Sequence, residues 1–110
     1  MSSFVELRNI KNDKGWFMLR AYLNENGLLL EGQDFCDEAE KVFGDEEYEY
    51  WYDFDAENTR KLWEAIGCPP ELDDAGKLAF LKEWFQEDIS DGRLLGVCRK
   101  FDVEYGLVQM

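Results

Sequence analysis

The first half of the chain alternates between apolar and polar side chains with a period of two, which is typical of half-buried β-strands. Turn sequences interrupt this pattern at residues 12–15 and 24–27, and the second turn ends in Asn26-Gly27, a strong hairpin signal. A short helical turn or an irregular connection is expected at residues 36–43. The pattern therefore predicts antiparallel strands at residues 3–10, 16–23, 28–35 and 46–54.

The fourth predicted strand separates its side chains into an aromatic set and a mostly acidic set. The aromatic set is Tyr48, Tyr50, Tyr52 and Phe54, and the opposite set is Glu47, Glu49, Trp51 and Asp53. The second strand divides in the same way, with Phe17, Leu19, Ala21 and Leu23 opposite Trp16, Met18, Arg20 and Tyr22. Antiparallel sheets with one packed face and one solvated face have this pattern. We expect the aromatic set of the fourth strand to lie in the core.

After residue 54 the apolar positions recur with the period of an amphipathic helix. Asp55 is expected to cap a helix that runs to about Ile66, and Gly67 is expected to end it. Two more helices are predicted at about residues 74–86 and 92–101. The side chains expected to face inward are Thr59, Leu62, Trp63, Ile66, Leu78, Leu81, Phe85, Leu94, Val97, Cys98 and Phe101, with Phe80 and Trp84 beside them.

A block of strands followed by a block of helices indicates an α+β fold. The length of 110 residues agrees with a single domain over residues 1–110. Residues 103–108 alternate weakly and are expected to form a closing edge strand. We therefore predict an antiparallel sheet of about four to five strands with two to three helices packed on one face.

Acidic charge is concentrated between Glu31 and Glu57. This stretch holds twelve acidic residues and a single base, Lys41, so it carries −11 of the formal net charge of −13. Such a field can steer a basic protein partner and speed its association. Binding of phosphates needs a basic patch, so we expect no nucleic-acid partner.

The residue types present remove several classes of function. The chain has no His, which removes Ser-His and Cys-His nucleophilic sites and the usual zinc sites. Its three cysteines, Cys36, Cys68 and Cys98, are widely spaced, and we expect reduced, mostly buried thiols. No apolar run reaches membrane-spanning length, and the start lacks a secretory pattern. We expect a cytoplasmic protein with no membrane contact, no cofactor and no enzymatic activity.

Two carboxylate patterns in the sequence resemble metal sites. The run from Asp53 to Glu64 has the acidic spacing of a calcium loop, but a helix starting at Asp55 would hold these carboxylates too far apart to surround one ion. Glu47 and Glu49 share a strand face with Asp53, which would suit a metal-dependent enzyme. Chance pairing in an acidic chain explains both patterns, so we predict no metal site.

Trp51 is the exception on the acidic face of its strand. Aromatic residues, Trp above all, carry much of the binding energy at protein interfaces. The alternative is that Trp51 packs on residues 36–44 or under a second covering layer. The predicted contact surface consists of Glu46, Glu47, Glu49, Trp51 and Asp53, flanked by an acidic field of Asp34, Asp37, Glu38 and Glu40.

Two functions follow from this surface. The first is a small inhibitor, such as an immunity protein or antitoxin, that neutralises a basic, nuclease-like toxin. The alternative is a non-enzymatic interaction module, such as a homodimer, whose acidity only keeps it soluble. Binding to a basic protein with steep salt dependence would favour the first, and self-association through Trp51 would favour the second.

Overall fold

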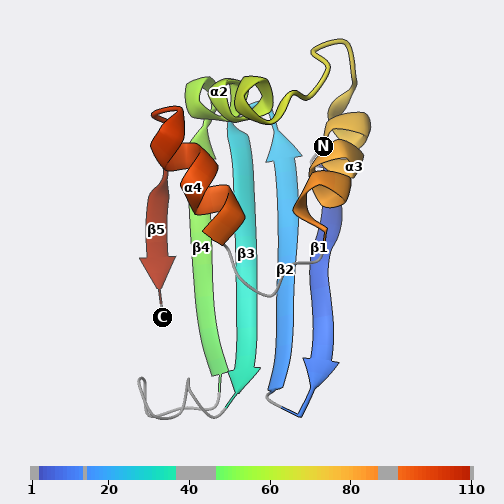
Figure 1. Cartoon of the computed structure of the whole chain (residues 1–110), viewed down its shortest axis with the longest axis vertical. Coiled ribbons are helices and arrows are strands. Elements are labelled where there is room, and N and C mark those ends of the chain that lie inside the picture. The colour runs from blue at the N-terminus through green and yellow to red at the C-terminus, as the bar shows by residue number, and fades with distance from the viewer. Residues whose placement is uncertain (1–2, 14, 37–46, 87–91, 110) are drawn as a thin grey trace.

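The computed structural model describes residues 3–13, 15–36, 47–86 and 92–109. Five antiparallel strands form one sheet in the order β1-β2-β3-β4-β5 (Figure 1). They are β1 (Ser3–Asn12), β2 (Gly15–Asn24), β3 (Gly27–Cys36), β4 (Glu47–Asp55) and β5 (Gly106–Gln109). The four predicted strands and the closing edge strand are confirmed. The connection predicted at residues 36–43 lies outside the described residues, apart from Cys36, which ends β3.

The hairpin predicted between β2 and β3 is present, but its two turn residues are Glu25 and Asn26 rather than Asn26 and Gly27, since Gly27 already pairs with Asn24 as the first residue of β3. The backbone N–H of Asn26 donates to Oδ1 of Asn24 over 2.8 Å. Gly27 has a φ of 132°, and a Cβ there would lie 2.0 Å from the carbonyl oxygen of Phe54. Both features require glycine, so this residue fixes the pairing of β3 with its two neighbours.

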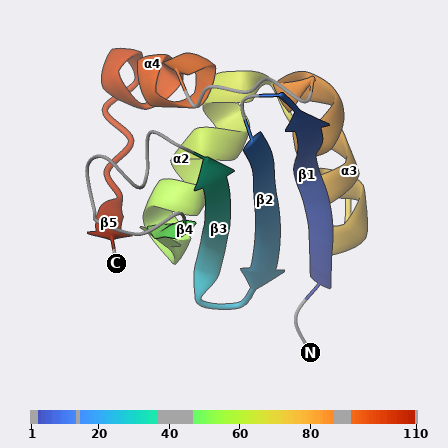
Figure 2. The same ribbon diagram turned by 90° about the horizontal axis from the view of Figure 1, so that it is seen from below.

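All three described helices pack on one face of the sheet (Figures 1 and 2). They are α2 (Ala56–Ile66), α3 (Asp74–Phe85) and α4 (Gly92–Lys100). Asp55 caps α2 by accepting a hydrogen bond of 2.8 Å from the backbone N–H of Asn58. Gly67 ends this helix in the left-handed conformation, with a φ of 78°. The described structure is therefore α+β, as the sequence predicts.

The core lies between the sheet and these helices. The aromatic set of β4 contributes to it, since Tyr50, Tyr52 and Phe54 are buried and Tyr48 is half-buried. The largest fully buried apolar side chains are Leu7, Leu19, Leu28, Leu30, Phe54, Leu62, Leu78, Leu81, Phe85 and Leu94. They come from four strands and all three helices, so a single core holds the elements together.

One inward-facing residue was predicted wrongly. Phe101 is 48% exposed, because α4 ends at Lys100 and its stripe of buried residues does not continue. Asp102 then takes a positive φ of 55°, which turns the chain. Val103 is buried after this turn. The helical period therefore stops one residue before the apolar pattern suggests.

β1 contains a bulge that the sequence pattern did not reveal. The pairing of β1 with β2 shifts between Glu6 and Arg8, so Leu7 is an extra residue. Leu7 and Arg8 are both buried as a result. The guanidinium of Arg8 donates a hydrogen bond of 3.2 Å to the hydroxyl of Tyr50 and lies 5.3 Å from the ring centroid of Phe85. A charged side chain is thereby held within the core.

Candidate binding face

The face of the sheet opposite the described helices is the strongest candidate site, and we call it the open face. Strand pairing and alternation assign its side chains, none of which is buried. They are Phe4, Glu6, Asn9, Lys11, Trp16, Met18, Arg20, Tyr22, Leu29, Glu31, Gln33, Phe35, Glu49, Trp51, Asp53 and Val108. In Figure 1 the helix side of the sheet faces the viewer, with α4 drawn in front of β4, so the open face points away from the viewer. Aromatic rings and charges are interleaved across it.

Trp51 lies near the acidic side of the open face. It is half-buried and pairs across the strands with Glu31 on one side and Val108 on the other. Its indole N–H donates to Oε2 of Glu31 over 3.3 Å. Arg20 is the next residue across the sheet from Glu31, and Glu6 follows Arg20. The ring of Trp51 is thus fixed by a carboxylate and remains partly accessible.

Two further carboxylates flank Trp51 along its own strand. Glu49 and Asp53 each lie two residues away, roughly 7 Å along the strand on the same face. Oε1 of Glu49 accepts a hydrogen bond of 3.1 Å from the side-chain amide of Gln33, and Asp53 is exposed. With Glu31, these carboxylates surround the indole on three sides. A cationic group approaching Trp51 would meet negative charge and an aromatic ring together.

A second tryptophan on the open face has the opposite surroundings. Trp16 is 37% exposed and donates its indole N–H to Oδ1 of Asn9 over 2.7 Å. Its ring packs against Phe35, with centroids 5.8 Å apart, and the amine of Lys11 lies 5.4 Å from its centroid. The basic group is therefore beside Trp16 and the acidic groups are beside Trp51. The two indoles provide a matched pair for experiment.

The structure brings together only part of the predicted contact surface. Glu49, Trp51 and Asp53 share the open face, as expected. Glu47 belongs to β4 and pairs with Phe35, although its side chain lies outside the described part of the chain. The remaining predicted residues outside the described part are Asp37, Glu38, Glu40 and Glu46.

Asp34 is placed on the other side of the sheet. It pairs with Phe17 and Tyr48, and it lies on the same face of β3 as Leu30, toward the helices. The sheet therefore separates Asp34 from Trp51, and this carboxylate does not flank the indole.

Sequence reasoning missed several residues of the open face. The sequence pattern shows Glu31 as part of the acidic stretch but does not place it beside Trp51, and it does not mark Phe4 as a surface residue. Phe4 is exposed and stacks on Tyr22 with ring centroids 5.7 Å apart. The hairpin turn indicates only the register of β2 with β3, whereas Glu31 meets Trp51 through the pairing of β3 with β4, and Phe4 meets Tyr22 through the pairing of β1 with β2.

The calcium-loop-like run is divided between two elements. Asp53 lies on β4, whereas Asp55 caps α2 and Glu64 pairs with Arg60 across 2.8 Å. Among residues 3–13, 15–36, 47–86 and 92–109, no group of three or more acidic, cysteine or histidine side chains could hold a metal ion.

Asp55, Cys68 and Cys98 have shifted pKa values with clear causes. Hydrogen bonds from the backbone and then the side chain of Asn58 lower the pKa of Asp55. Burial raises the pKa of the Cys98 thiol to about 11 and also raises the pKa of Cys68. Both cysteines are unpaired and buried, as predicted for them, and burial keeps the unreactive thiol form.

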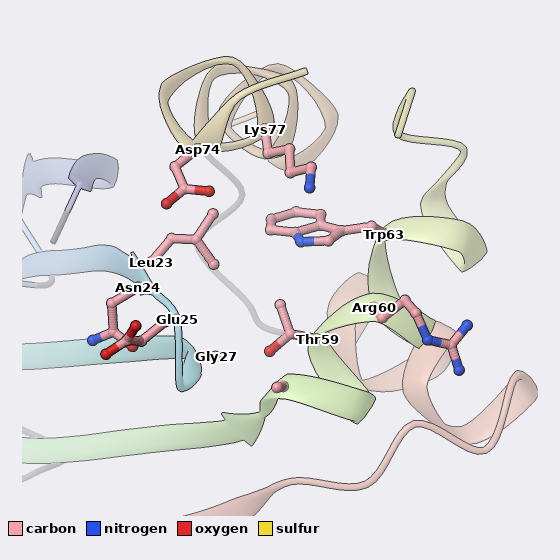
Figure 3. A pocket seen from close by; sticks show the side chains of 10 residues that line it. Leu23, Asn24, Glu25, Gly27, Thr59, Arg60, Trp63, Asp74 and Lys77 are labelled. Atoms are coloured by element: carbon pink, nitrogen blue, oxygen red, sulfur yellow. The ribbon is translucent and has the colours of Figure 1, made fainter. Parts of the chain in front are cut away.

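A small hollow lies beside the turn between β2 and β3 (Figure 3). It has a volume of about 200 Å³ between the β2–β3 turn, α2 and α3, with Trp63 and Leu23 on its apolar side. The hydroxyl of Thr59 already bonds two backbone groups of β3 and β4. Asp74 and Lys77 complete the lining from α3. The hollow offers no serine- or cysteine-based nucleophile with a neighbouring base.

Within the described part of the chain, no helix is both long enough and apolar enough to cross a membrane. Comparison with protein-family models, with curated proteins and with solved structures finds no match.

Proposed function

We propose that this chain is a small acidic inhibitor that binds a basic protein, such as a nuclease-like toxin, through the part of the open face around Trp51. The observation that carries the proposal is the half-buried indole of Trp51, held by Glu31 and flanked by Glu49 and Asp53. A fixed, partly accessible Trp is the kind of residue that dominates binding energy at interfaces.

The surrounding charge defines the kind of partner. A net charge of −13 on 110 residues attracts basic surfaces and speeds their association with the chain. Enzymes that cleave nucleic acids carry positive charge where the phosphates bind. A rigid acidic sheet face can cover such a surface, and the Trp51 ring then supplies the desolvated contact that slows dissociation.

Self-association through the open face is the second candidate. Phe4 is 63% exposed and stacks on Tyr22, so the β1–β2 side of this face carries accessible apolar surface. Sedimentation of the chain alone over a range of concentrations measures this, with Phe4→Ser as the variant that should abolish a dimer.

The test of the inhibitor is capture from the source cell's lysate at low and high salt, with the chain as bait. Retained proteins are identified, and any basic one is purified and assayed for nucleic-acid cleavage with and without the chain. We expect a basic protein that is retained at low salt and whose cleavage activity the chain suppresses.

Trp51→Ala and Trp16→Ala form the matched pair for this assay. Removing the Trp51 ring should cost about 2 kcal/mol or more of binding, which is roughly thirtyfold in Kd. Trp16→Ala should weaken binding much less, because Lys11 rather than a carboxylate lies beside that ring. Equal losses for both variants, or a captured protein whose activity is unaffected, would refute the proposal.

A further inference from the structure

The two edges of the sheet are protected to very different degrees. β1 carries the bulge at Leu7, the charges of Glu6 and Lys11, and contacts with α3, all features that discourage pairing with another chain. β5 has the sequence Gly-Leu-Val-Gln, with no charge and no proline, and every residue in it is exposed. No described strand pairs with its outer side. Figure 1 shows it at the edge of the sheet.

Exposed apolar side chains are concentrated in β5 and in the segment of the chain just before it. Of the six large hydrophobic side chains that are exposed in the described residues, four lie between residues 101 and 108. They are Phe101, Tyr105, Leu107 and Val108. The pairing with β4 puts Leu107 on the helix side of the sheet and Val108 on the open face beside Trp51. An added strand would therefore find apolar surface on both of its sides.

We propose that the outer edge of β5 accepts an extended segment of the basic partner as a sixth strand. Backbone hydrogen bonds supply affinity in this mode of recognition, and alternate side chains supply specificity. That the partner is basic rests on the proposed function. The new part is that this partner docks through β5.

The negative charge of the chain favours a basic partner over a second copy of the chain at the outer edge of β5. Pairing two β5 edges would bring together two chains that each carry −13. Beside the edge, a hollow of about 330 Å³ is lined by Asp53, Asp55 and Glu104, with the phenol of Tyr105. Gly106 pairs with Asp53 and has no side chain to stand between Asp53 and an added strand. A lysine or arginine placed opposite Gly106 can therefore reach this carboxylate.

These positions predict the pattern of the docking segment. Basic side chains should alternate with apolar ones, the basic ones on the side of Asp53 and the apolar ones on the side of Leu107. A peptide of about eight residues that alternates lysine and valine is a direct probe. One control is the same peptide with every backbone nitrogen methylated, so that neither of its edges has an N–H group to donate to β5. A second control replaces lysine with glutamate.

The measurement is amide hydrogen exchange of Leu107, Val108 and Gln109 in the intact chain, with and without each peptide. Pairing should slow exchange of the outward-facing N–H groups of β5 about tenfold or more with the lysine peptide. Neither control peptide should do so. Unchanged exchange with the lysine peptide, or equal protection by the methylated one, would overturn the proposal.

Proline variants give an independent readout of the same edge. Successive N–H groups of a strand point to opposite sides, so only one of Leu107→Pro and Val108→Pro removes an outward donor. The variant that lacks only the outward donor keeps its bonds to β4, so its midpoint of urea denaturation should equal that of the parent. This variant should bind the lysine peptide about tenfold more weakly than the parent does. If neither variant folds, exchange in the unmodified chain still decides. The proposed function fails separately, when no captured basic protein depends on Trp51.

Discussion

The two faces of the sheet are built by the same strands and differ in what covers them. On the helix-covered face, Leu19, Leu30 and Phe54 are at most 1% exposed. On the open face, Phe4 and Trp16 are 63% and 37% exposed, although they are as apolar as the core residues. Apolar content alone therefore does not distinguish a core from a binding surface. What distinguishes the open face is that charged residues are interleaved with its rings.

Adjacent residues make this contrast most directly. Leu29 and Leu30 are neighbours on β3, and alternation sends one to each face. Leu30 is fully buried between β2 and β4, whereas Leu29 is half-buried on the open face. The same side chain thus contributes to folding at one position and to an accessible surface at the next.

The largest expected effect comes from truncating each of these leucines. Leu30→Ala should lower the free energy of unfolding by about 2–5 kcal/mol, since it removes buried contacts and leaves a cavity. Leu29→Ala should lower it by roughly 1 kcal/mol or less, because water already reaches this side chain. Urea denaturation of both variants measures the difference. Similar losses for the two would mean that a layer covers the open face in solution.

A smaller effect concerns how the covering helices are fastened to the sheet. The buried hydroxyl of Thr59 on α2 accepts a hydrogen bond from the N–H of Leu28 over 2.9 Å and donates one to the carbonyl of Phe54 over 3.2 Å. Thr59→Val keeps the shape but leaves these groups unpaired, at a cost of about 1–3 kcal/mol.

Thr59→Ser is the matched control for this contact. It keeps the hydroxyl and removes one methyl group, so it should retain more stability than Thr59→Val. The same urea titration tests both. The reverse order would show that the methyl group of Thr59, rather than its hydroxyl, secures α2 to the sheet.

Sequence reasoning predicted the elements and the division of β4 because these depend on local patterns. Alternation within β4 correctly separated Trp51 from Tyr50 and Tyr52, and Asp55 and Gly67 marked the two ends of α2. Local signals of this kind lie within a few residues of the feature that they determine.

The errors arose where tertiary pairing decides. Each face of β3 carries both apolar and polar side chains, so alternation alone does not show which face is buried. Only the register of β3 with β2 and β4 shows that Asp34 faces the helices. The bulge at Leu7 likewise has no local mark, and it shows only in the pairing of β1 with β2, where it allows Leu7 and Arg8 both to be buried. The stop of α4 before Phe101 depends on the turn at Asp102. The neighbours of Trp51 across the sheet were missing from the sequence reading for the same reason.

The smallest expected effect is a dependence of stability on pH that comes from Asp55, the N-terminal cap of α2. Hydrogen bonds from Asn58 lower the pKa of Asp55 in the folded chain below its ordinary value of 3.8. The folded chain therefore binds this proton less readily than the unfolded chain, and stability rises with pH in that range. The contribution is fully present above the unfolded pKa and is lost as the pH falls through the lowered folded pKa.

Asp55→Asn keeps a capping oxygen without a titrating group. The free energy of unfolding of the parent, relative to that of the variant, should be constant from about pH 5 upward and should fall toward pH 3. Urea titrations of both proteins at matched pH values measure this difference, and a difference that stays constant down to pH 3 would show that the cap makes no charge-dependent contribution to the fold.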